Sequence, residues 1–404
     1  MKELRRALPY LKRYRSRIIL GVIAVTISNV FTVAIPRVIG ETIDDLGGTI
    51  TAAEINERAL LIVGLTVLAG IFLFLTRQLI IVTSRYIERD LRNDFMDHVQ
   101  SLSMSWYTKT TTGDIMALAT NDVPRVREFV GPAVMYAANT VTTFSFALAM
   151  MLSLSIEVTL LALLPLPFVS FLVYRLGKKI HVLFGSVQAQ YAGLTSNAQE
   201  SISGIRVIRA YVRESWAESS FARLSELYRQ KNMEYVRIDA LMMPAMMTLI
   251  GTSVIIVLWV GGNRVIAGTS SIGDVVQFIA YISLLIWPVI AIGWITNLVQ
   301  RAAAAMGRIN KVFDLEPEIA DSEKTDGTIT EISGGLEFRN VSLIYDPARP
   351  PILNNLDFSV KPGETLAIVG ATGSGKTSIV NLIARVYEAS GGDVLIDGHP
   401  ISAV

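Results

Sequence analysis

The residues most suited to chemistry lie in the stretch GATGSGKT at positions 370–377. The stretch matches the pattern GxxxxGK(S/T), in which glycines let backbone N–H groups turn inward onto a phosphate. Lys376 can reach the β- and γ-phosphates of a nucleotide, and the Thr377 hydroxyl can bind Mg²⁺. A glycine-rich turn that binds no ligand is the alternative. The predicted site for ATP and Mg²⁺ consists of Gly370, Ala371, Thr372, Gly373, Ser374, Gly375, Lys376 and Thr377.

The segments around this loop predict how it is positioned. TLAIVG at 365–370 has the apolar pattern of a strand, and SIVNLIARVY at 378–387 has that of a helix. Upstream, LEFRNVSLIY at 336–345 and ILNNLDFSV at 352–360 contain the short apolar runs and alternation of strands. Strand, glycine loop and helix in this order are typical of a P-loop. We therefore expect an α/β domain to start at Leu336.

The composition indicates a membrane protein. Hydrophobic residues make up 51% of the 404, and the mean hydropathy of +0.46 is high for an ordinary soluble fold. The net charge of +1 argues against a nucleic-acid partner, which needs a concentrated basic face. The absence of cysteine excludes disulfides and thiolate metal sites, and the three histidines have no metal-ligand spacing.

Six apolar runs are each long enough to cross a bilayer core of about 30 Å as a helix. Buried helices of a large soluble protein are the alternative, but they do not explain so many runs in one chain. The runs lie near 18–40, 59–83, 129–153, 156–176, 240–262 and 275–298.

Lys and Arg are placed unevenly around the first run. Residues 2–17 contain seven of them, whereas residues 41–58 contain only Arg58 among five acidic residues. By the positive-inside rule, the N-terminus is cytoplasmic in a multi-pass protein of the cell (cytoplasmic or inner) membrane. Residues 1–16 mix Leu and Tyr with basic side chains, which suits an interfacial helix. A plain positive-inside anchor is an equally good interpretation.

Two long inner loops have the pattern of helical hairpins. In 84–128, apolar residues recur mainly every fourth position until the sequence breaks near Thr112–Asp114. In 177–239, a similar stripe has Gly204 near its middle. Each hairpin is expected to project from the membrane into the cytoplasm. The stripes are Ile87, Leu91, Phe95, Val99 and Leu102 in the first loop, and Tyr191, Leu194, Ala198, Ile202 and Ile205 in the second.

Together these features resemble an ATP-binding cassette (ABC) exporter, specifically a bacterial multidrug-type half-transporter. The local marks are TGDIMALATNDV (112–123), ESISGIRVIRAYVRE (200–214), FRNVSLIYD (338–346) and the P-loop. The resemblance implies an α-helical domain with six transmembrane helices and long cytoplasmic hairpins, followed by an α/β nucleotide-binding domain. The implied division is an N-terminal interfacial (elbow) helix over 1–16, the transmembrane domain over 17–316, an acidic linker over 317–335 and the first part of the nucleotide-binding domain over 336–404.

The resemblance also implies roles for residues and partners. Tyr345 matches the tyrosine on which the family stacks adenine, although from the residues alone it is a strand aromatic of the core. The tips near Thr112–Asp114 and Gly204–Tyr211 match coupling helices, the second usually docked on a partner subunit; capped hairpins with solvated tips are the alternative. The partners implied are a second half-transporter (identical or different), membrane lipid, and a hydrophobic small-molecule or lipid substrate.

The family's later ATPase motifs do not occur in this sequence. VLID at 394–397 resembles the Mg²⁺-positioning run but is followed by Gly398 instead of Glu, and we assign it to a hairpin with His399 at the surface. We therefore expect the 404-residue chain by itself to lack ATPase activity.

The leading hypothesis for the function is ATP-driven export. The alternatives are a nucleotide-binding membrane scaffold or sensor, and a P-loop kinase fused to a membrane anchor. Met242, Met243, Met246 and Met247 form an adaptable substrate surface or a packing surface.

Overall fold

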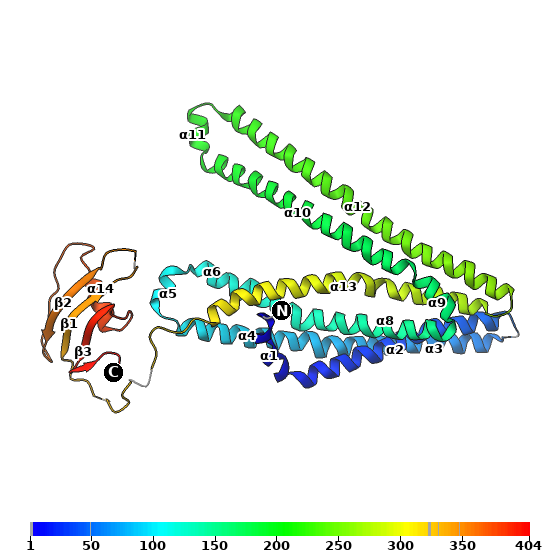
Figure 1. Cartoon of the computed structure of the whole chain (residues 1–404), viewed down its shortest axis with the longest axis horizontal. Coiled ribbons are helices and arrows are strands. Elements are labelled where there is room, and N and C mark those ends of the chain that lie inside the picture. Colours follow the sequence, from blue (N-terminus) through cyan, green and yellow to red (C-terminus); the bar gives the residue numbers. More distant parts are fainter. Residues whose placement is uncertain (1–2, 49, 322–324, 330, 347) are drawn as a thin grey trace. The chain divides into compact units, whose positions relative to one another are not determined.

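The computed structural model describes residues 3–48, 50–321, 325–329, 331–346 and 348–404, and these form two compact units (Figure 1). Unit 1 comprises residues 1–19, 78–134 and 296–404, and unit 2 comprises residues 20–77 and 135–295. The helical elements are η1 Glu3–Ala7, α1 Leu8–Arg13, α2 Arg15–Leu46, α3 Ala52–Thr76, η2 Arg77–Ile81, α4 Val82–Ser101, α5 Met104–Lys109, α6 Thr112–Ala117, η3 Leu118–Asp122, α7 Val123–Glu128, η4 Phe129–Ala133, α8 Val134–Leu154, α9 Ile156–Leu163, α10 Pro165–Ser203, α11 Ile205–Ala210, α12 Glu214–Ile266, α13 Ile272–Phe313 and α14 Lys376–Ile383. The strands are β1 Leu336–Leu343, β2 Leu353–Val360, β3 Gly391–Ile396 and β4 His399–Pro400.

Among the described residues, five continuous helical stretches are long and apolar enough to cross a membrane. The protein is therefore a largely helical, multi-pass membrane protein. The expected run near 156–176 falls instead on α9 and α10, which are separated at Leu164 and do not qualify as one span. Pro165 begins α10 and lacks the N–H that would continue the preceding helix. The five stretches are Arg15–Leu46, Ala52–Ser101, Thr112–Leu154, Glu214–Ile266 and Ile272–Phe313.

In unit 2, α8, α9, α12 and α13 bury a common apolar core. Tyr281 and Leu285 of α13, Met151 of α8 and Val257 of α12 are almost fully buried in it. The helices α10 and α12 run side by side as a long hairpin that ends at α11 (Figure 1).

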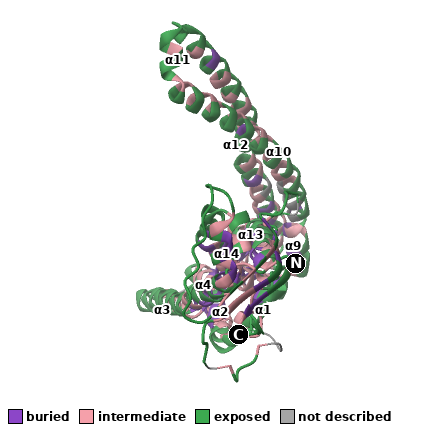
Figure 2. Cartoon of the chain, turned by 90° about the vertical axis from the view of Figure 1, so that its left-hand side faces the viewer, coloured by how far each residue is buried: buried purple, intermediate pink, exposed green. Residues whose placement is uncertain are grey.

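The helical hairpin expected in 177–239 is present as α10 and α12, but its apolar stripe is largely exposed. Tyr191 is 53% exposed, Ile202 73% and Ile205 44%, and most of the hairpin surface is exposed or half-buried (Figure 2). Two paired helices bury little surface between them, and even the rings of Tyr191 and Tyr228, 5.8 Å apart across the hairpin, are not buried.

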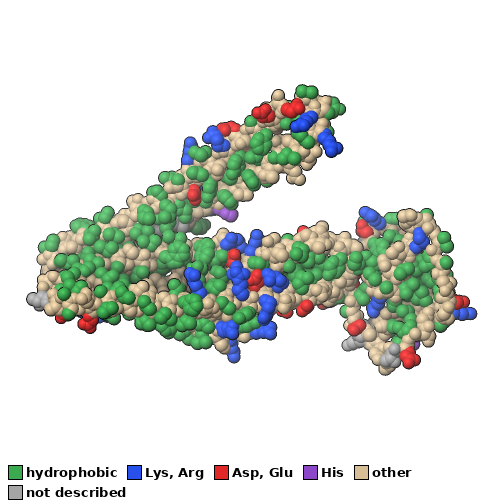
Figure 3. All heavy atoms as spheres, turned by 180° about the vertical axis from the view of Figure 1, so that it is seen from behind, with side chains coloured by type: hydrophobic (Ala, Val, Ile, Leu, Met, Phe, Trp, Pro, Cys, Tyr) green, Lys and Arg blue, Asp and Glu red, His purple; other side chains and the backbone are tan. Residues whose placement is uncertain are grey.

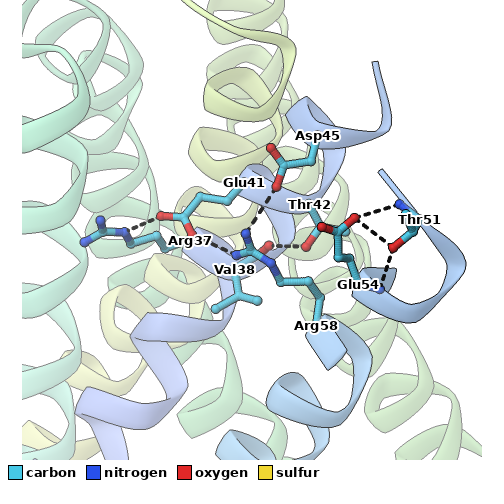
Figure 4. A network of polar contacts seen from close by, with 8 residues as sticks. All are labelled: Arg37, Val38, Glu41, Thr42, Asp45, Thr51, Glu54 and Arg58. Carbon is cyan, nitrogen blue, oxygen red and sulfur yellow. Dashed lines mark hydrogen bonds and ion pairs between the residues drawn. The ribbon is translucent and has the colours of Figure 1, made fainter. Parts of the chain in front are cut away.

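The turn between α2 and α3 in unit 2 is held by a network of charged groups (Figure 4). Arg58 of α3 contacts Glu41 and Asp45 of α2, each at 3.2 Å, and Glu41 also accepts a bond from Arg37 at 2.8 Å. Thr51 caps the start of α3 by accepting from the backbone N–H of Glu54. Most of the acidic stretch at 41–58 is therefore helical, with residues 41–46 in α2 and residues 52–58 in α3.

In unit 1, α4 carries the apolar stripe predicted from the sequence. Ile87, Leu91, Phe95 and Val99 are each at most 3% exposed, which confirms the amphipathic helix. The neighbouring α13 contributes Ala302, Ala305, Met306 and Ile309 to the same core.

Residues 3–14 pack against this helical core. Leu4 and Ala7 are buried in the core, and Tyr10 donates to Asp94 of α4. Arg6 pairs with Asp314 just after α13, at 2.6 Å. The N-terminal segment therefore joins α4 to the end of α13.

The strands form one antiparallel sheet in the order β2-β1-β3-β4. Phe338 of β1 pairs with Phe358 of β2 and Val394 of β3, and α14 packs Leu382 against this core. The strand expected at 365–370 is absent from the described sheet, and this expectation is wrong for the structure. A strand needs a partner edge, and none of the described strands pairs with this segment.

Candidate nucleotide-binding site

The GATGSGKT loop ends where α14 begins, at Lys376. Gly373 and Gly375 have φ of +84° and +88°, a region that side-chain-bearing residues rarely adopt. A Cβ on Gly375 would also lie 2.9 Å from Leu353 Cδ2 and 3.3 Å from the Ile352 carbonyl oxygen, at the start of β2. The glycine at 375 is therefore required both by the turn and by the neighbouring strand.

The Lys376 ammonium lies over the loop itself. Its Nζ donates to the carbonyl oxygens of Gly370 and Ala371, both at 2.8 Å, and contacts Ser374 Oγ at 3.4 Å. A Cβ on Gly370 would meet that same Ser374 hydroxyl at 2.7 Å, so the loop closes tightly around the lysine. Thr377 follows in the first turn of α14 and is exposed. A cation, a hydroxyl and the positive end of a helix are thus gathered at one loop, which suits a phosphate with its Mg²⁺.

Tyr345 lies beside the same helix. It is in the bend after β1, and its hydroxyl donates to Ser378 Oγ of α14 at 3.1 Å. Its half-buried ring packs edge-on against Tyr387, with centroids 4.6 Å apart. The structure therefore brings Tyr345 next to the residue that follows Thr377. Ser378 and Tyr387 were not predicted, because no local pattern marks a contact between residues this far apart in the chain.

The segment before the loop is exposed. Leu366 is 49% exposed, Ile368 38% and Val369 92%, an unusual environment for apolar residues. The loop is therefore supported mainly by α14 and by the start of β2.

Asp397 joins residues 333–335 to the sheet. Its carboxylate accepts from the backbone N–H groups of Ser333 at 2.6 Å, Gly334 at 3.2 Å and Gly335 at 2.7 Å. These bonds, the one from Gly335 first, lower the pKa of Asp397 from its ordinary value. His399 pairs with Ile396 in the β3–β4 hairpin and is exposed, as expected.

Each hairpin tip carries a short helix. Thr111 Oγ1 accepts from the Asp114 N–H and caps α6, and Gly204 precedes α11. At α11 the side chains of Val207 and Tyr211 are 62% and 75% exposed. The tips therefore have the local form of helices that present side chains outward.

Comparison with known protein families shows to which family the chain belongs. The model described as "ABC transporter transmembrane region" matches residues 18–289, and the model described as "ABC transporter" matches residues 353–403. The chain belongs to the ABC transporter family. The second match spans the glycine loop, so this ABC transporter chain carries part of an ATP-binding domain.

Several curated ABC proteins are similar over nearly the whole chain. A probable multidrug resistance ABC transporter ATP-binding/permease protein of Bacillus subtilis (strain 168) is 31% identical, over 98% of this chain and 68% of the relative. A multidrug resistance-like ATP-binding protein of Escherichia coli (strain K12) is 30% identical, over 97% and 66%. An ATP-dependent lipid A-core flippase of Syntrophus aciditrophicus (strain SB) is 28% identical, over 100% and 67%. The chain thus spans about two thirds of the length of these relatives.

Proposed function

We propose that this chain is a subunit of an ATP-driven exporter that moves hydrophobic or amphipathic molecules, drugs or lipids, across the cytoplasmic membrane. The observation that carries the proposal is the combination, in one chain, of the matched transmembrane region with the glycine loop that closes around Lys376. Relatives whose names refer to multidrug resistance and to lipid A-core flipping support this class of substrate.

The residues proposed to hold Mg-ATP are those of the loop and Tyr345. Lys376 and the loop N–H groups would bind the phosphates, Thr377 would contribute its hydroxyl to Mg²⁺, and Tyr345 would contact the base. Mg²⁺, when bound, neutralises the charge that develops on the phosphates. The surroundings fit a phosphate, because positive φ at Gly373 and Gly375 turns backbone toward the centre of the loop.

The membrane arrangement belongs to the same proposal. We infer six spans, with α9 and the first part of α10 as the fourth, and a cytoplasmic N-terminus and ATP-binding domain. Residues 1–16 would lie at the membrane interface, residues 17–316 would form the transmembrane domain, residues 317–335 the linker, and residues 336–404 the first part of the nucleotide-binding domain. The exposed side chains at α6 and α11 would dock on the nucleotide-binding domains of this chain and of a second subunit, identical or different.

Transport by a chain that extends residues 1–404 with the ATPase motifs of the family, in inside-out membrane vesicles, tests the proposal. We expect Mg-ATP to drive uptake of a fluorescent hydrophobic dye or a labelled lipid, and Lys376→Ala to abolish it. Lys361→Ala is a matched control, because Lys361 is an exposed lysine of the same domain outside the loop. ATP binding that depends on Lys376 without ATP-driven movement of any probe would instead favour a nucleotide-binding scaffold or sensor.

A further inference from the structure

Three arginines gather around two tyrosine rings in unit 1, where α1, α2 and α4 meet. The rings of Tyr14 and Tyr86 are stacked with centroids 6.2 Å apart. The Arg17 guanidinium lies 5.3 Å from the centroid of the Tyr86 ring, and the Arg89 guanidinium lies 5.6 Å from it. Arg13 is adjacent to Tyr14 in the chain and is the third member. We call these five residues the Tyr86 cluster.

A buried carboxylate fixes the geometry of the Tyr86 cluster. The side chain of Asp90 is only 8% exposed; it accepts from the Tyr14 hydroxyl at 2.8 Å and from Arg89 at 2.7 Å. Arg13 lies 3.4 Å from the same carboxylate. Among the described residues Arg17 has no ion pair, and the single carboxylate of Asp90 is shared by Arg13 and Arg89. The cluster therefore keeps a surplus of positive charge on a preorganised frame.

The guanidinium groups remain open to a ligand. The side chains of Arg13 and Arg89 are 69% and 59% exposed although both contact Asp90, and Arg17 is exposed too. One turn further along α4, Asp94 is bonded to Tyr10. The free donors of Arg13, Arg17 and Arg89 are therefore on the outer surface of the cluster.

Both helices change from apolar to basic at the cluster. In α2, Arg17 is followed directly by apolar residues, of which Ile19 and Leu20 are 56% and 53% exposed. In the stretch Ala52–Ser101, residues 59–76 carry no charged side chain, whereas Arg77, Arg85 and Arg89 follow. Figure 3 shows Lys and Arg side chains gathered in a band on the surface. A position at the end of two apolar helices is the depth of lipid headgroups.

We propose that the Tyr86 cluster binds the phosphate headgroup of an anionic phospholipid in the cytoplasmic leaflet. Guanidinium groups match phosphate oxygens in pairs, and tyrosines are favoured at the membrane interface. Asp90 acts as a positioning residue, because it bonds Tyr14 and Arg89 while the side chains of Arg13 and Arg89 stay more than half exposed. The bound lipid would bridge the start of α2 and the start of α4.

Lipid retention on the purified full chain tests the proposal. Native mass spectrometry would count the lipids kept after titration with phosphatidylglycerol, with phosphatidylcholine as the zwitterionic comparison. We expect Arg17→Gln to lower retention of phosphatidylglycerol about fivefold, the factor that corresponds to ~1 kcal/mol for one basic residue near an anionic surface. Arg5→Gln removes the same charge from an exposed residue outside the cluster, and we expect little change.

A second variant distinguishes a specific lipid-binding site from non-specific electrostatic attraction of anionic lipid. Asp90→Asn raises the net charge by one, so non-specific attraction to the charge predicts more retained phosphatidylglycerol. If instead the bonds of Asp90 to Tyr14 and Arg89 position the lipid-binding groups, the variant retains less. If Asp90→Asn fails to fold, the comparison of Arg17→Gln with Arg5→Gln still decides. Equal losses in those two variants would overturn the proposal. Competition of inorganic phosphate at millimolar concentration against the lipid, with equal weakening in Arg17→Gln, would instead identify a free-phosphate site.

Discussion

Lys376 occupies the position from which one side chain can both close the glycine loop and meet a phosphate. Its ammonium donates to the carbonyl oxygens of Gly370 and Ala371. We expect Lys376→Ala to weaken Mg-ATP binding tenfold or more, because it removes a charge-assisted contact worth about 1.5 to 3 kcal/mol. Titration of the detergent-solubilised chain with labelled ATP measures this, beside Lys361→Ala. Unchanged affinity in Lys376→Ala would contradict the assignment of the loop.

Tyr345 contributes a ring and a hydroxyl that can be tested separately. Its hydroxyl bonds Ser378 and its ring packs on Tyr387. We expect Tyr345→Ala to weaken ATP binding by about 1 to 3 kcal/mol, the contribution of a stacked base, and to leave tripolyphosphate binding unchanged. Tyr345→Phe keeps the ring and should bind ATP nearly as well as the unaltered chain. Equal weakening of both ligands in Tyr345→Ala would show that Tyr345 supports α14 instead of the base.

At the scale of elements, residues 333–335 and the β3–β4 hairpin are joined through one carboxylate. Asp397 accepts three backbone N–H bonds from residues 333–335, and its pKa lies below the ordinary value of 3.8. A lowered pKa in the folded state means that this carboxylate stabilises the fold above about pH 4 and loses that effect as the pH falls further. We expect Asp397→Asn to melt at a lower temperature than the unaltered chain at pH 7, and the difference to shrink toward pH 3.

Thermal unfolding at several pH values, followed by the circular dichroism of the chain, measures this dependence. Asp393→Asn is a suitable control, because Asp393 is an exposed aspartate of the same strand pair. If the two variants show the same pH dependence, the bonds to residues 333–335 do not contribute to stability.

At the scale of the whole molecule, phosphoryl transfer needs more than the roles proposed for Lys376 and Thr377, which would hold phosphate and Mg²⁺. A further residue must orient the attacking water. The apolar segment at 365–369 is also exposed, which favours aggregation. We expect the reconstituted 404-residue chain to release phosphate from ATP at the background rate.

Phosphate release with and without vanadate measures this activity, beside a longer chain extended with the ATPase motifs of the family. Vanadate-sensitive turnover by residues 1–404 near the rate of the longer chain would show that the catalytic groups lie within this sequence. Binding of ATP without turnover would agree with the prediction.

The sequence by itself determined the features whose interactions are local. The five confirmed apolar helices and the buried stripe of Ile87, Leu91 and Phe95 were predicted from patterns within one segment. The helix expected at 378–387 is present too, as α14, although it begins at Lys376 and ends at Ile383. Helical hydrogen bonds join residues four apart, so a single run of sequence is enough to specify them.

Only the tertiary structure decided the features that join distant segments. Strand pairing left 365–370 outside the sheet, and helix pairing left Tyr191 and Ile202 exposed. Two hydrogen bonds likewise link residues far apart in the chain, one between Tyr345 and Ser378 and one between Tyr14 and Asp90. Such contacts depend on which surfaces meet after folding, and a pattern within one segment carries no information about its partner.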